Sequence, residues 1–275
     1  GALIHKAKVT QVSQTEDGVV VDAEIEGEAT RLHGLWLIGA DGASSVVRKD
    51  LGLAFDGETY PTVSISIGTP FPFEEHVDGL CGVNYFWADG WSFSMFQTKN
   101  MWRVGYSPPV DLDDETAVSD QEVQARLSRI LPGCGPFEIV TARLYSVHRR
   151  LVERMRVGRI LLAGDAAHLN SPSGGFGMNG GVHDAFNLTD KLTRVWNGED
   201  DALLDRYARQ RHHAASSDIQ KTSDANHKRH REKDTTKRMA ALKEMQDIIA
   251  DEARAYKFMR ESSLMDSLER ANAIE

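Results

Sequence analysis

Residues 158–192 read GRILLAGDAAHLNSPSGGFGMNGGVHDAFNLTDKL, and this stretch decides the fold. The apolar run 159–163 predicts one short buried strand. Gly164-Asp165 closes that strand at its carboxyl end, where open α/β sheets bind their ligands. Residues 169–179 combine glycine, proline, serine and asparagine, so an irregular loop is expected there. From 182 to 195 apolar residues recur at the spacing of a helix.

The order of strand, acidic residue, glycine-rich loop and helix predicts a cofactor site. A glycine loop that opens a helix exposes backbone N–H groups, and the helix dipole adds partial positive charge there. Asp165 at the strand end is an acceptor for a sugar or polyol hydroxyl. These features favour a nucleotide-like or flavin-like cofactor. The alternative is that the glycines only serve tight turns.

The motif pieces GRILLAGDAAH, Pro172, GGFGMN and DAFNL resemble the second flavin-binding motif of the class A flavoprotein monooxygenases. These are single-component, FAD-dependent aromatic hydroxylases similar to p-hydroxybenzoate hydroxylase. Ser171 departs from the pattern, because many members have a second proline there. The resemblance implies that Met178 and Asn179 face the pyrimidine end of the flavin and that Pro172 walls its oxygen-reacting face. The residues that it implies for FAD binding in this motif are Gly164, Asp165, Pro172, Gly174, Gly175, Gly177, Met178 and Asn179.

A second motif lies earlier in the chain. Residues 35–40 (LWLIGA) predict a strand buried on both faces, followed by Asp41-Gly42 and a helix over about 44–51. GADGASSVVRKDLG resembles the D-G-x-x-S-x-x-R motif of the same hydroxylases, with Asp41, Gly42, Ser45 and Arg48 on its positions; Asp41, Gly42 and Arg48 are assigned to FAD. In that family the motif lies near the FAD pyrophosphate and is implicated in NAD(P)H use.

Residues 60–110 are rich in β-branched and aromatic residues and predict antiparallel strands, with a turn at Asp89-Gly90. Any single aromatic residue in this stretch could simply pack in the core of the sheet, which is the alternative to a functional role. In the resembling family a sheet in this position roofs the flavin and forms an apolar pocket for a flat aromatic substrate. The residues assigned to the substrate on that basis are Asn84, Phe86, Trp91 and Phe93.

Three basic or titratable residues, His148, Arg149 and Arg150, precede the strand of the first motif. They are interpreted either as a solvated basic turn or as an anion site for cofactor phosphates or NAD(P)H. Arg150 is the best single candidate for NAD(P)H.

Local patterns predict the remaining elements. Alternating residues over 9–12 and 19–25 predict a β-hairpin, and 119–131 predict a helix that Ser119 or Asp120 caps. Residues 206–238 are locally basic and are expected to form the exposed face of long helices. Their histidines complete no recognisable ligand pattern, so no metal site is expected.

The composition limits the classes of function. A net charge of -9 argues against a general nucleic-acid binder. The two cysteines have neither a metal-binding nor a redox spacing, so a cytoplasmic, reducing location is expected. No apolar run approaches the length of a membrane helix. In the family the C-terminal helices cover the domain or meet a second subunit, so a homodimer is left open.

The predicted fold is mixed α/β, a partial Rossmann-like FAD-binding domain with an inserted antiparallel-sheet substrate domain and C-terminal helices. The ranges expected for these parts are 1–58 and 148–200 for FAD, 59–147 for the substrate and 201–275 for the helices. The family's N-terminal G-x-G-x-x-G unit, which binds the ADP half of FAD, is absent from this sequence.

The resemblance implies an FAD-dependent, NAD(P)H-consuming monooxygenase. Such an enzyme uses O₂ to hydroxylate an aromatic or heteroaromatic small molecule through a flavin hydroperoxide. No side chain is expected to act as a catalytic nucleophile, because the flavin does the chemistry. The alternatives are a related flavoenzyme, halogenase or reductase, and an inert fragment or scaffold without the ADP-binding unit.

Overall fold

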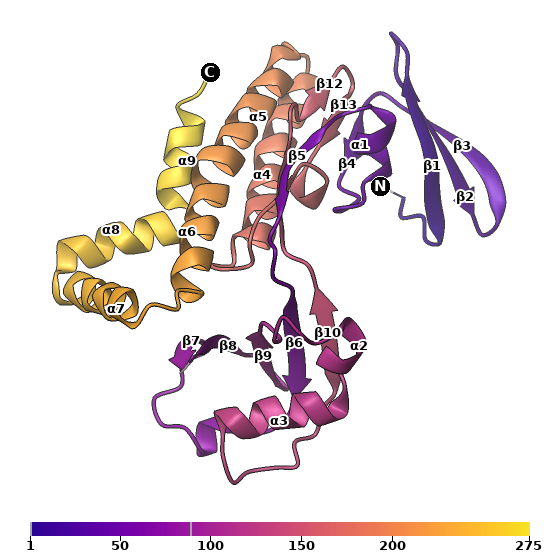
Figure 1. Ribbon diagram of the computed structural model, residues 1–275. Helices are drawn as coiled ribbons and strands as arrows, with labels where there is room; N and C mark the ends of the chain where they lie inside the picture. The colour runs from indigo at the N-terminus through magenta and orange to yellow at the C-terminus, as the bar shows by residue number, and fades with distance from the viewer. Residues whose placement is uncertain (1, 89) are drawn as a thin grey trace. The chain divides into compact units, whose positions relative to one another are not determined.

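The computed structural model describes residues 2–88 and 90–275, so the turn expected at Asp89-Gly90 lies partly outside the described residues. The chain forms two compact units, which are described one at a time (Figure 1). Unit 1 comprises the residues up to Glu58, His148–Ala225 and Ile248–Glu275. Unit 2 comprises Thr59–Val147 and Asn226–Asp247.

The strands of unit 1 form three small sheets within the described residues. One has the order β1-β2-β3, with β1 at Ala7–Gln14, β2 at Val19–Ile25 and β3 at Glu28–Gly34. A second has the order β14-β11-β5, with β5 at Phe55–Thr59, β11 at His148–Val152 and β14 at His168–Leu169. The third has the order β12-β13-β4, with β4 at Leu37–Gly39, β12 at Arg156–Val157 and β13 at Ile160–Leu162.

The predicted hairpin of β1 and β2 is confirmed, and β3 is an addition that the sequence did not predict. Glu26 and Gly27 both have positive φ, 54° and 91°, as a tight two-residue hairpin turn requires. β3 then pairs with β2 along its whole length, from Val19 opposite Gly34 to Ile25 opposite Glu28. Its residues are mostly exposed, so no apolar pattern marks it as a strand.

The strand expected over 35–40 is shorter and more exposed than predicted. β4 pairs in parallel with β13, and Leu37, Ile38 and Gly39 lie opposite Ile160, Leu161 and Leu162. Ile38 is 41% exposed, so the expectation of burial on both faces is wrong for the described chain. Leu37 packs against an apolar core, whereas Ile38, on the other face of the strand, belongs to no core cluster among the described residues.

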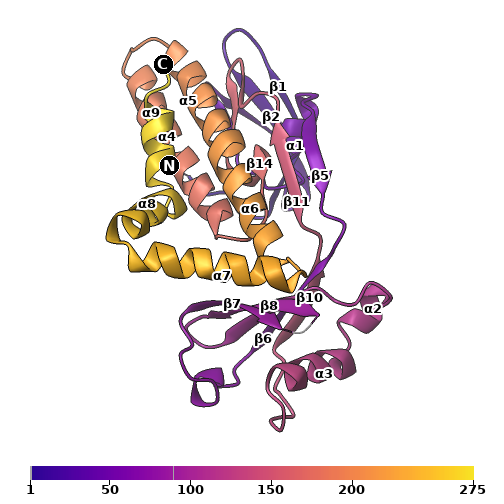
Figure 2. The ribbon, with the colours of Figure 1, turned by 60° about the vertical axis from the view of Figure 1, so that its left-hand side comes forward.

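Helices complete unit 1. They are α1 (Val46–Asp50), the 3₁₀ turn η2 (Gly164–Ala166), α4 (Phe176–Trp196), α5 (Ala202–His213), the π-helical segment η3 (Ala214–Gln220), α8 (Glu252–Ser262) and α9 (Met265–Asn272). A further helix, α6 (Lys221–His230), begins in unit 1 and ends in unit 2. α5, η3 and α6 follow one another without interruption, and α4, α5 and α9 lie side by side (Figures 1 and 2). The main core packs apolar residues of β13 against α4 and α5, including Leu161, Leu188 and Tyr207.

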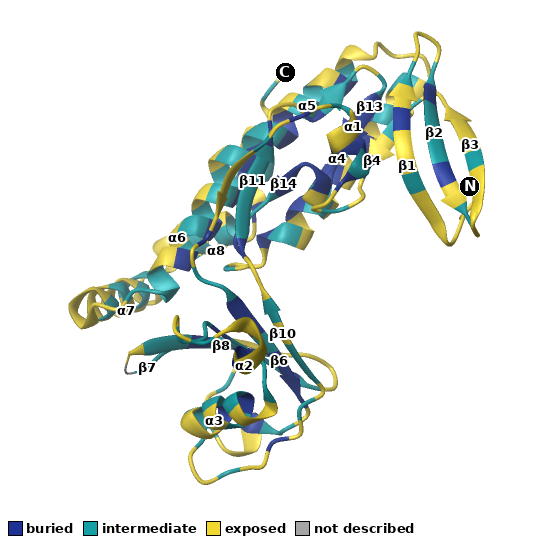
Figure 3. Cartoon of the chain, turned by 45° about the vertical axis from the view of Figure 1, so that its right-hand side comes forward, coloured by how far each residue is buried: buried dark blue, intermediate teal, exposed yellow. Residues whose placement is uncertain are grey.

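Unit 2 is built on one antiparallel sheet of order β10-β6-β9-β8-β7. Its strands are β6 (Ser64–Thr69), β7 (Val83–Ala88), β8 (Trp91–Gln97), β9 (Trp102–Tyr106) and β10 (Thr141–Tyr145). The 3₁₀ turn η1 (Phe73–Glu75) and the helices α2 (Asp114–Ala117) and α3 (Asp120–Ile130) accompany them. Val123 and Leu127 of α3 are fully buried against one face of the sheet (Figure 3).

The predicted cap of α3 is confirmed, because the Ser119 hydroxyl accepts the N–H of Glu122. α7 (Thr235–Ala250) has no buried residue, as Figure 3 shows. None of the helices among the described residues combines the length and apolar character that crossing a bilayer requires. The structure confirms the predicted mixed α/β class.

Candidate functional site

The candidate cofactor site begins where β13 ends. Ile160, Leu161 and Leu162 are almost completely buried, so the strand is a rigid support. Gly164 turns the chain at a φ of 60°, and the Ala167 N–H closes the turn on the Gly164 carbonyl at 2.8 Å. Asp165 stands on this turn with an exposed side chain that has no hydrogen-bond partner among the described residues. A free carboxylate is therefore held at the end of a buried strand.

α4 begins earlier than the sequence predicts. The loop was expected to reach 179, but Gly175 caps the helix at a φ of 73° and Phe176 is its first residue. Glycines 180 and 181 lie inside the helix, and an isoleucine side chain approaches Gly180 closely. A Cβ there would come within 2.9 Å of Cδ1 of Ile219. A larger residue at Gly180 would therefore require the Ile219 side chain to shift.

The early start of α4 determines which of its backbone N–H groups lack an acceptor within the helix. The first N–H groups of an α-helix have no partner within the helix, and here they belong to Phe176, Gly177 and Met178. Asn179 is the first residue whose N–H has an intrahelical acceptor, and its side-chain amide donates to the Gly175 carbonyl at 2.9 Å. Of the two amides assigned to the pyrimidine end of the flavin, helix geometry leaves that of Met178 free.

A buried carboxylate fixes this turn from behind. Asp184 of α4 is completely buried, and its Oδ2 accepts the Gly164 N–H at 2.8 Å and lies 2.8 Å from Nε2 of His168. Its Oδ1 accepts the Nε–H of Arg211 at 2.6 Å. Arg211, which is 1% exposed, also donates to the Gly180 carbonyl.

The surroundings of Asp184 keep it ionised. Burial by itself raises the pKa of this carboxyl, but the hydrogen bond from His168 and the charges of His168 and Arg211 bring the pKa below 3.8. Asp184 and Arg211 were not predicted from the sequence as residues of the site. Helical spacing places Asp184 among apolar positions of α4, which was the available signal for a buried acid.

In the D-G-x-x-S-x-x-R motif, side chains of the motif form hydrogen bonds with its own backbone. The Asp41 carboxylate accepts the N–H groups of Val46 and Val47 at 2.7 and 3.2 Å, so it caps α1. The Ser45 hydroxyl accepts the Arg48 N–H at 2.9 Å. The N-terminal amides of α1 are therefore already occupied by side chains of the motif itself.

Arg48 connects the two motifs. It is 5% exposed, and its guanidinium donates to the carbonyls of Ala43 at 2.8 Å and Ala166 at 2.9 Å. It also lies over the ring of Phe55 at 3.8 Å. Burial lowers the pKa of Arg48. This geometry makes Arg48 a positioning residue that ties η2 to α1, and its assignment to FAD stays a prediction.

The residues predicted for the second motif lie together on an accessible loop. Asp165, Pro172, Gly174, Gly175, Met178 and Asn179 are exposed, and Gly177 is half-buried. Gly174 and Gly175 have φ of 107° and 73°, a conformation that suits only glycine. Ser171, which stands where relatives have proline, is fully buried, and its hydroxyl accepts the Ser173 N–H at 3.3 Å.

The basic stretch before β13 is not a turn. His148, Arg149 and Arg150 form most of β11. Arg149 pairs with Glu58 at 2.9 Å, and Arg150 donates to the Phe55 carbonyl at 3.1 Å. The interpretation as a solvated turn is wrong because β11 is held between β14 and β5. The role of Arg150 toward NAD(P)H stays a prediction.

The predicted substrate residues lie mostly in the core of unit 2. Phe93 is 7% exposed, and Phe86 and Trp91 stack on it with ring centroids 4.6 and 4.9 Å away. These rings occupy the sheet face that packs on α3. Asn84 exchanges hydrogen bonds with the Cys81 backbone. The structure does not bring the four together on an open surface, so their substrate role stays a prediction.

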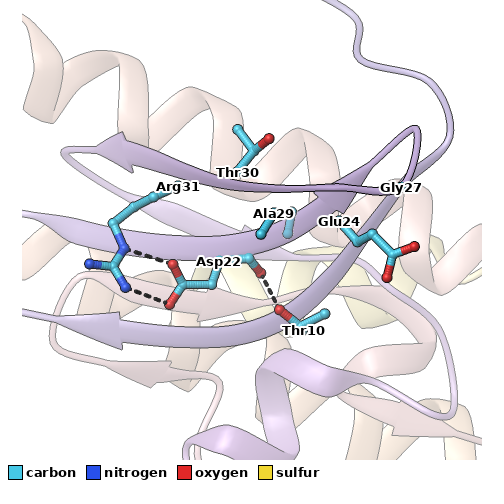
Figure 4. A pocket seen from close by; sticks show the side chains of 8 residues that line it. Thr10, Asp22, Glu24, Gly27, Ala29, Thr30 and Arg31 are labelled. Carbon is cyan, nitrogen blue, oxygen red and sulfur yellow. Dashed lines mark hydrogen bonds and ion pairs between the residues drawn. The ribbon is translucent and has the colours of Figure 1, made fainter.

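A hollow on the sheet of β1–β3 offers no comparable site. Its lining includes Thr10, Asp22, Glu24 and Arg31 (Figure 4). Arg31 donates to both carboxylate oxygens of Asp22 at 2.7 and 3.2 Å, and Thr10 donates to the Asp22 carbonyl at 3.0 Å. The Arg31 contact lowers the pKa of Asp22. Thr10, Asp22 and Arg31 thus satisfy one another, and Glu24 stands apart from them (Figure 4).

Comparison with known proteins gives the family. Residues 2–222 match the family model described as FAD binding domain. The chain is 33% identical over 209 residues to para-nitrophenol 4-monooxygenase of Pseudomonas sp. (strain WBC-3), covering 73% of this chain and 50% of that protein. It is 32% identical over 214 residues to 6-hydroxy-3-succinoylpyridine 3-monooxygenase of Pseudomonas putida (strain DSM 28022 / S16), covering 73% and 54%.

Comparison with solved structures also finds a monooxygenase and a hydroxylase. The crystal structure of p-nitrophenol 4-monooxygenase from Pseudomonas putida DLL-E4 superposes with a TM-score of 0.83 at 31% identity, covering 95% of this chain and 66% of that one. Aklavinone-11 hydroxylase, solved with FAD and aklavinone, gives 0.75 at 25% identity, covering 82% and 44%. The chain spans about half the length of the curated relatives it matches. The chain belongs to the FAD binding domain family, and the relatives and solved structures that it resembles are monooxygenases and a hydroxylase.

Proposed function

We propose that unit 1 holds FAD at the N-terminal end of α4 and that the whole protein is an NAD(P)H-consuming aromatic monooxygenase. The observation that carries the proposal is the exposed, glycine-lined start of α4 beside the unpaired carboxylate of Asp165. FAD has both groups that such a site recognises, a hydroxylated ribityl chain and a ring system that becomes anionic on reduction. The residues present therefore fit the cofactor.

Each part of the site has a role toward the cofactor. Asp165 accepts hydrogen bonds from hydroxyl groups of the ribityl chain. The free amides of Gly177 and Met178, at the positive end of the α4 dipole, stabilise negative charge on the flavin ring. Pro172 and the adjacent glycines exclude water from the reacting face. Bound FAD supplies the redox chemistry by which NAD(P)H and O₂ are used.

The buried residues behind the loop act by positioning. Asp184 holds the Gly164 N–H, and Arg48 holds the Ala166 carbonyl. The turn that carries Asp165 is thus fixed by one hydrogen bond on each side, and both partners are buried. Such preorganisation lowers the cost of ordering the loop when the cofactor binds.

The remaining parts of the proposal concern the substrate, the location and the assembly. A small aromatic substrate is expected at unit 2, as the relatives' names support. Cys81 and Cys134 are free thiols, which supports a cytoplasmic location. Met239, Leu242 and Ile249 of α7 are exposed apolar residues, which supports a homodimer that covers them. Light scattering, which measures the mass of the protein in solution, tests this.

A two-stage experiment tests the function. FAD is titrated into the full-length protein and followed by flavin fluorescence, and NAD(P)H oxidation is then recorded with a panel of phenols, aromatic acids and quinolones. Saturable FAD binding followed by substrate-dependent NAD(P)H consumption and a hydroxylated product in mass spectrometry supports the proposal. FAD binding with no hydroxylated product across the panel contradicts the monooxygenase assignment, and no FAD binding contradicts the whole proposal.

A further inference from the structure

The π-helical segment η3 interrupts the helical run between α5 and α6. π-helices form i→i+5 hydrogen bonds, are rare, and usually occur as short insertions at functional sites. In Figure 2 the segment lies between α5 and α6, with β11 and β14 beside it. The loop that joins β14 to α4, residues 170–175, is called the cofactor loop. η3 contacts the residue that adjoins this loop at each end.

Gln220, the last residue of η3, holds the place where the cofactor loop begins. Its Nε2 donates two hydrogen bonds, to the Arg150 carbonyl at 2.8 Å and to the Leu169 carbonyl at 3.0 Å. Arg150 of β11 and Leu169 of β14 lie directly opposite each other. Leu169 is the last residue of β14, so the side-chain amide spans two strands where the chain leaves the sheet. Both N–H groups of the amide are used for this.

Ile219 holds the other end of the cofactor loop. It is 1% exposed and packs in a small apolar cluster with Phe176 and Leu264. Phe176 is the first residue of α4. Cδ1 of Ile219 also lies next to Gly180, one turn further along α4. The free N–H groups at the start of α4 therefore follow directly on a side chain that η3 holds.

The far side of η3 is fastened to α9. Oδ1 of Asp218 accepts a hydrogen bond from Nη2 of Arg270 at 2.7 Å. Leu264, which precedes α9, has a φ of 61° and is buried. A bulky residue rarely adopts this left-handed conformation, and it persists where the surrounding structure holds it. Three consecutive residues of η3 thus contact three different neighbours, which are α9, the start of α4 and the end of β14.

We propose that Gln220 is a positioning residue for the flavin and that it acts through the cofactor loop, together with Ile219. The inference rests on the proposed function for the identity of the cofactor. Because the two residues are consecutive, η3 fixes both ends of the loop relative to each other. The amides of Gly177 and Met178 stabilise negative charge only where they meet the flavin ring. Loss of the Gln220 contacts should therefore weaken the binding of reduced, anionic flavin more than that of oxidised flavin.

Two glutamines of the same helical run provide a matched pair of variants. Gln220→Met loses both hydrogen bonds to the strand carbonyls. Gln210 of α5 is buried and contacts Asn187 and Ile274, which both lie outside the cofactor loop. Gln210→Met is the control, since it also removes an amide–carbonyl hydrogen bond and keeps an unbranched side chain. Both variants are expected to lower the free energy of unfolding to a similar degree.

Two measurements on the full-length protein separate positioning from stability. Without FAD, hydrogen exchange of the backbone amides of residues 170–178 is expected to become at least about fivefold faster in Gln220→Met. With FAD bound, the midpoint potential gives the ratio of the affinities for reduced and oxidised flavin. This ratio is expected to fall at least about threefold in Gln220→Met, which for a two-electron couple is about 14 mV toward lower potential. Gln210→Met is expected to match the wild type in both measurements.

The proposal is overturned if Gln220→Met leaves either the exchange or the potential unchanged. Equal shifts in Gln210→Met also overturn it, because the shifts would then report a general loss of stability. If Gln220→Met does not fold, Gln220→Asn decides, since it keeps the amide but is too short to hold both carbonyls, and the same two shifts must appear. Failure of the proposed function is recognised separately, by a wild-type protein that binds no FAD, whereas the exchange measurement needs no cofactor.

Discussion

The backbone N–H of Gly164 donates a 2.8 Å hydrogen bond to Oδ2 of Asp184, a residue 20 positions later in the chain. The same carboxylate binds Arg211 at 2.6 Å through its other oxygen. The turn after β13 is thereby fixed to the middle of α4 and to α5. A glycine-rich loop next to such an anchor has a defined shape at one end, which is what a cofactor site needs.

Asp184→Asn tests this anchor. The substitution keeps the size of the side chain but leaves the buried guanidinium of Arg211 without a counter-charge. Breaking a buried pair in this way costs about 3–5 kcal/mol, so we expect a large fall in the free energy of unfolding measured with urea. Asp190→Asn, an exposed position on the same helix, should change it by no more than about 0.5 kcal/mol. Equal stability of Asp184→Asn and wild type would refute the anchor.

The same residue predicts an acid limb in the stability profile. The folded-state pKa of Asp184 is below 3.8, so the unfolded chain binds the proton more readily. The contribution of ionised Asp184 to the free energy of unfolding is therefore fully present above pH 3.8. This contribution is lost as the pH falls through the lower, folded-state pKa. Urea unfolding across this range should show a smaller difference between wild type and Asp184→Asn at the acid end. A constant difference at every pH contradicts the assigned ionisation.

Asp165→Ala separates binding from stability. Asp165 is exposed and has no partner in the described chain, so its loss should leave the free energy of unfolding within about 0.5 kcal/mol. A hydrogen bond to a charged group is worth about 1.5–3 kcal/mol, so FAD affinity should fall roughly ten- to hundredfold in a fluorescence titration. Asp17→Ala, at an exposed turn of unit 1, is the matched control. Unchanged FAD affinity in Asp165→Ala removes the role assigned to the residue.

Arg48→Met should affect stability and binding together. Methionine fills much of the space over Phe55 but leaves the carbonyls of Ala43 and Ala166 without their donors. An unsatisfied buried acceptor costs about 1–3 kcal/mol, so thermal unfolding should occur at lower temperature. Because Ala166 belongs to η2, FAD affinity should fall as well. A variant that loses affinity at unchanged stability would instead indicate direct contact of Arg48 with the cofactor.

His230 predicts a pH effect in unit 2. Burial lowers its pKa below 6.5, outweighing the hydrogen bond to the Phe93 carbonyl. As the pH is lowered, the unfolded chain therefore takes up a proton at His230 more readily than the folded chain. The contribution of neutral His230 to the free energy of unfolding is complete above pH 6.5 and declines as the pH falls below that value. Fluorescence of Trp87, which bonds to the His230 backbone, should report loosening in this range. His230→Gln retains a donor and does not titrate, so its fluorescence should stay constant over that interval.

The sequence predicted the parts of the fold that local patterns encode. The β13 strand, its Gly164-Asp165 turn and the cap of α3 follow from apolar runs and capping residues. The start of α4 did not, because residues 174–181 are rich in glycine and indicate a loop, whereas the helix begins at Phe176 and includes Gly177, Gly180 and Gly181. β3 was not predicted because its residues are exposed and show no alternation of apolar and polar side chains. The turn at Glu26-Gly27 was its only signal in the sequence.

The candidate site was predictable to a similar degree. The exposed loop residues were found through their motif, whereas the buried anchors at Asp184 and Arg211 depend on contacts between helices. In unit 2 the alternation around Phe86 and Phe93 gave two faces without saying which one is covered. Only packing against α3 decides this, and it places those rings in the core of unit 2.

The parallel pairing of β4 with β13 affects how the chain is made. Leu37–Gly39 leaves the ribosome long before Ile160–Leu162, and all the strands of unit 2 are synthesised in between. At typical rates of synthesis this delay is on the order of ten seconds. For that time the apolar edge at Leu37 and Ile38 has no partner, which is when a nascent chain is most open to wrong associations. The sheet that supports the cofactor loop is therefore completed late in biosynthesis.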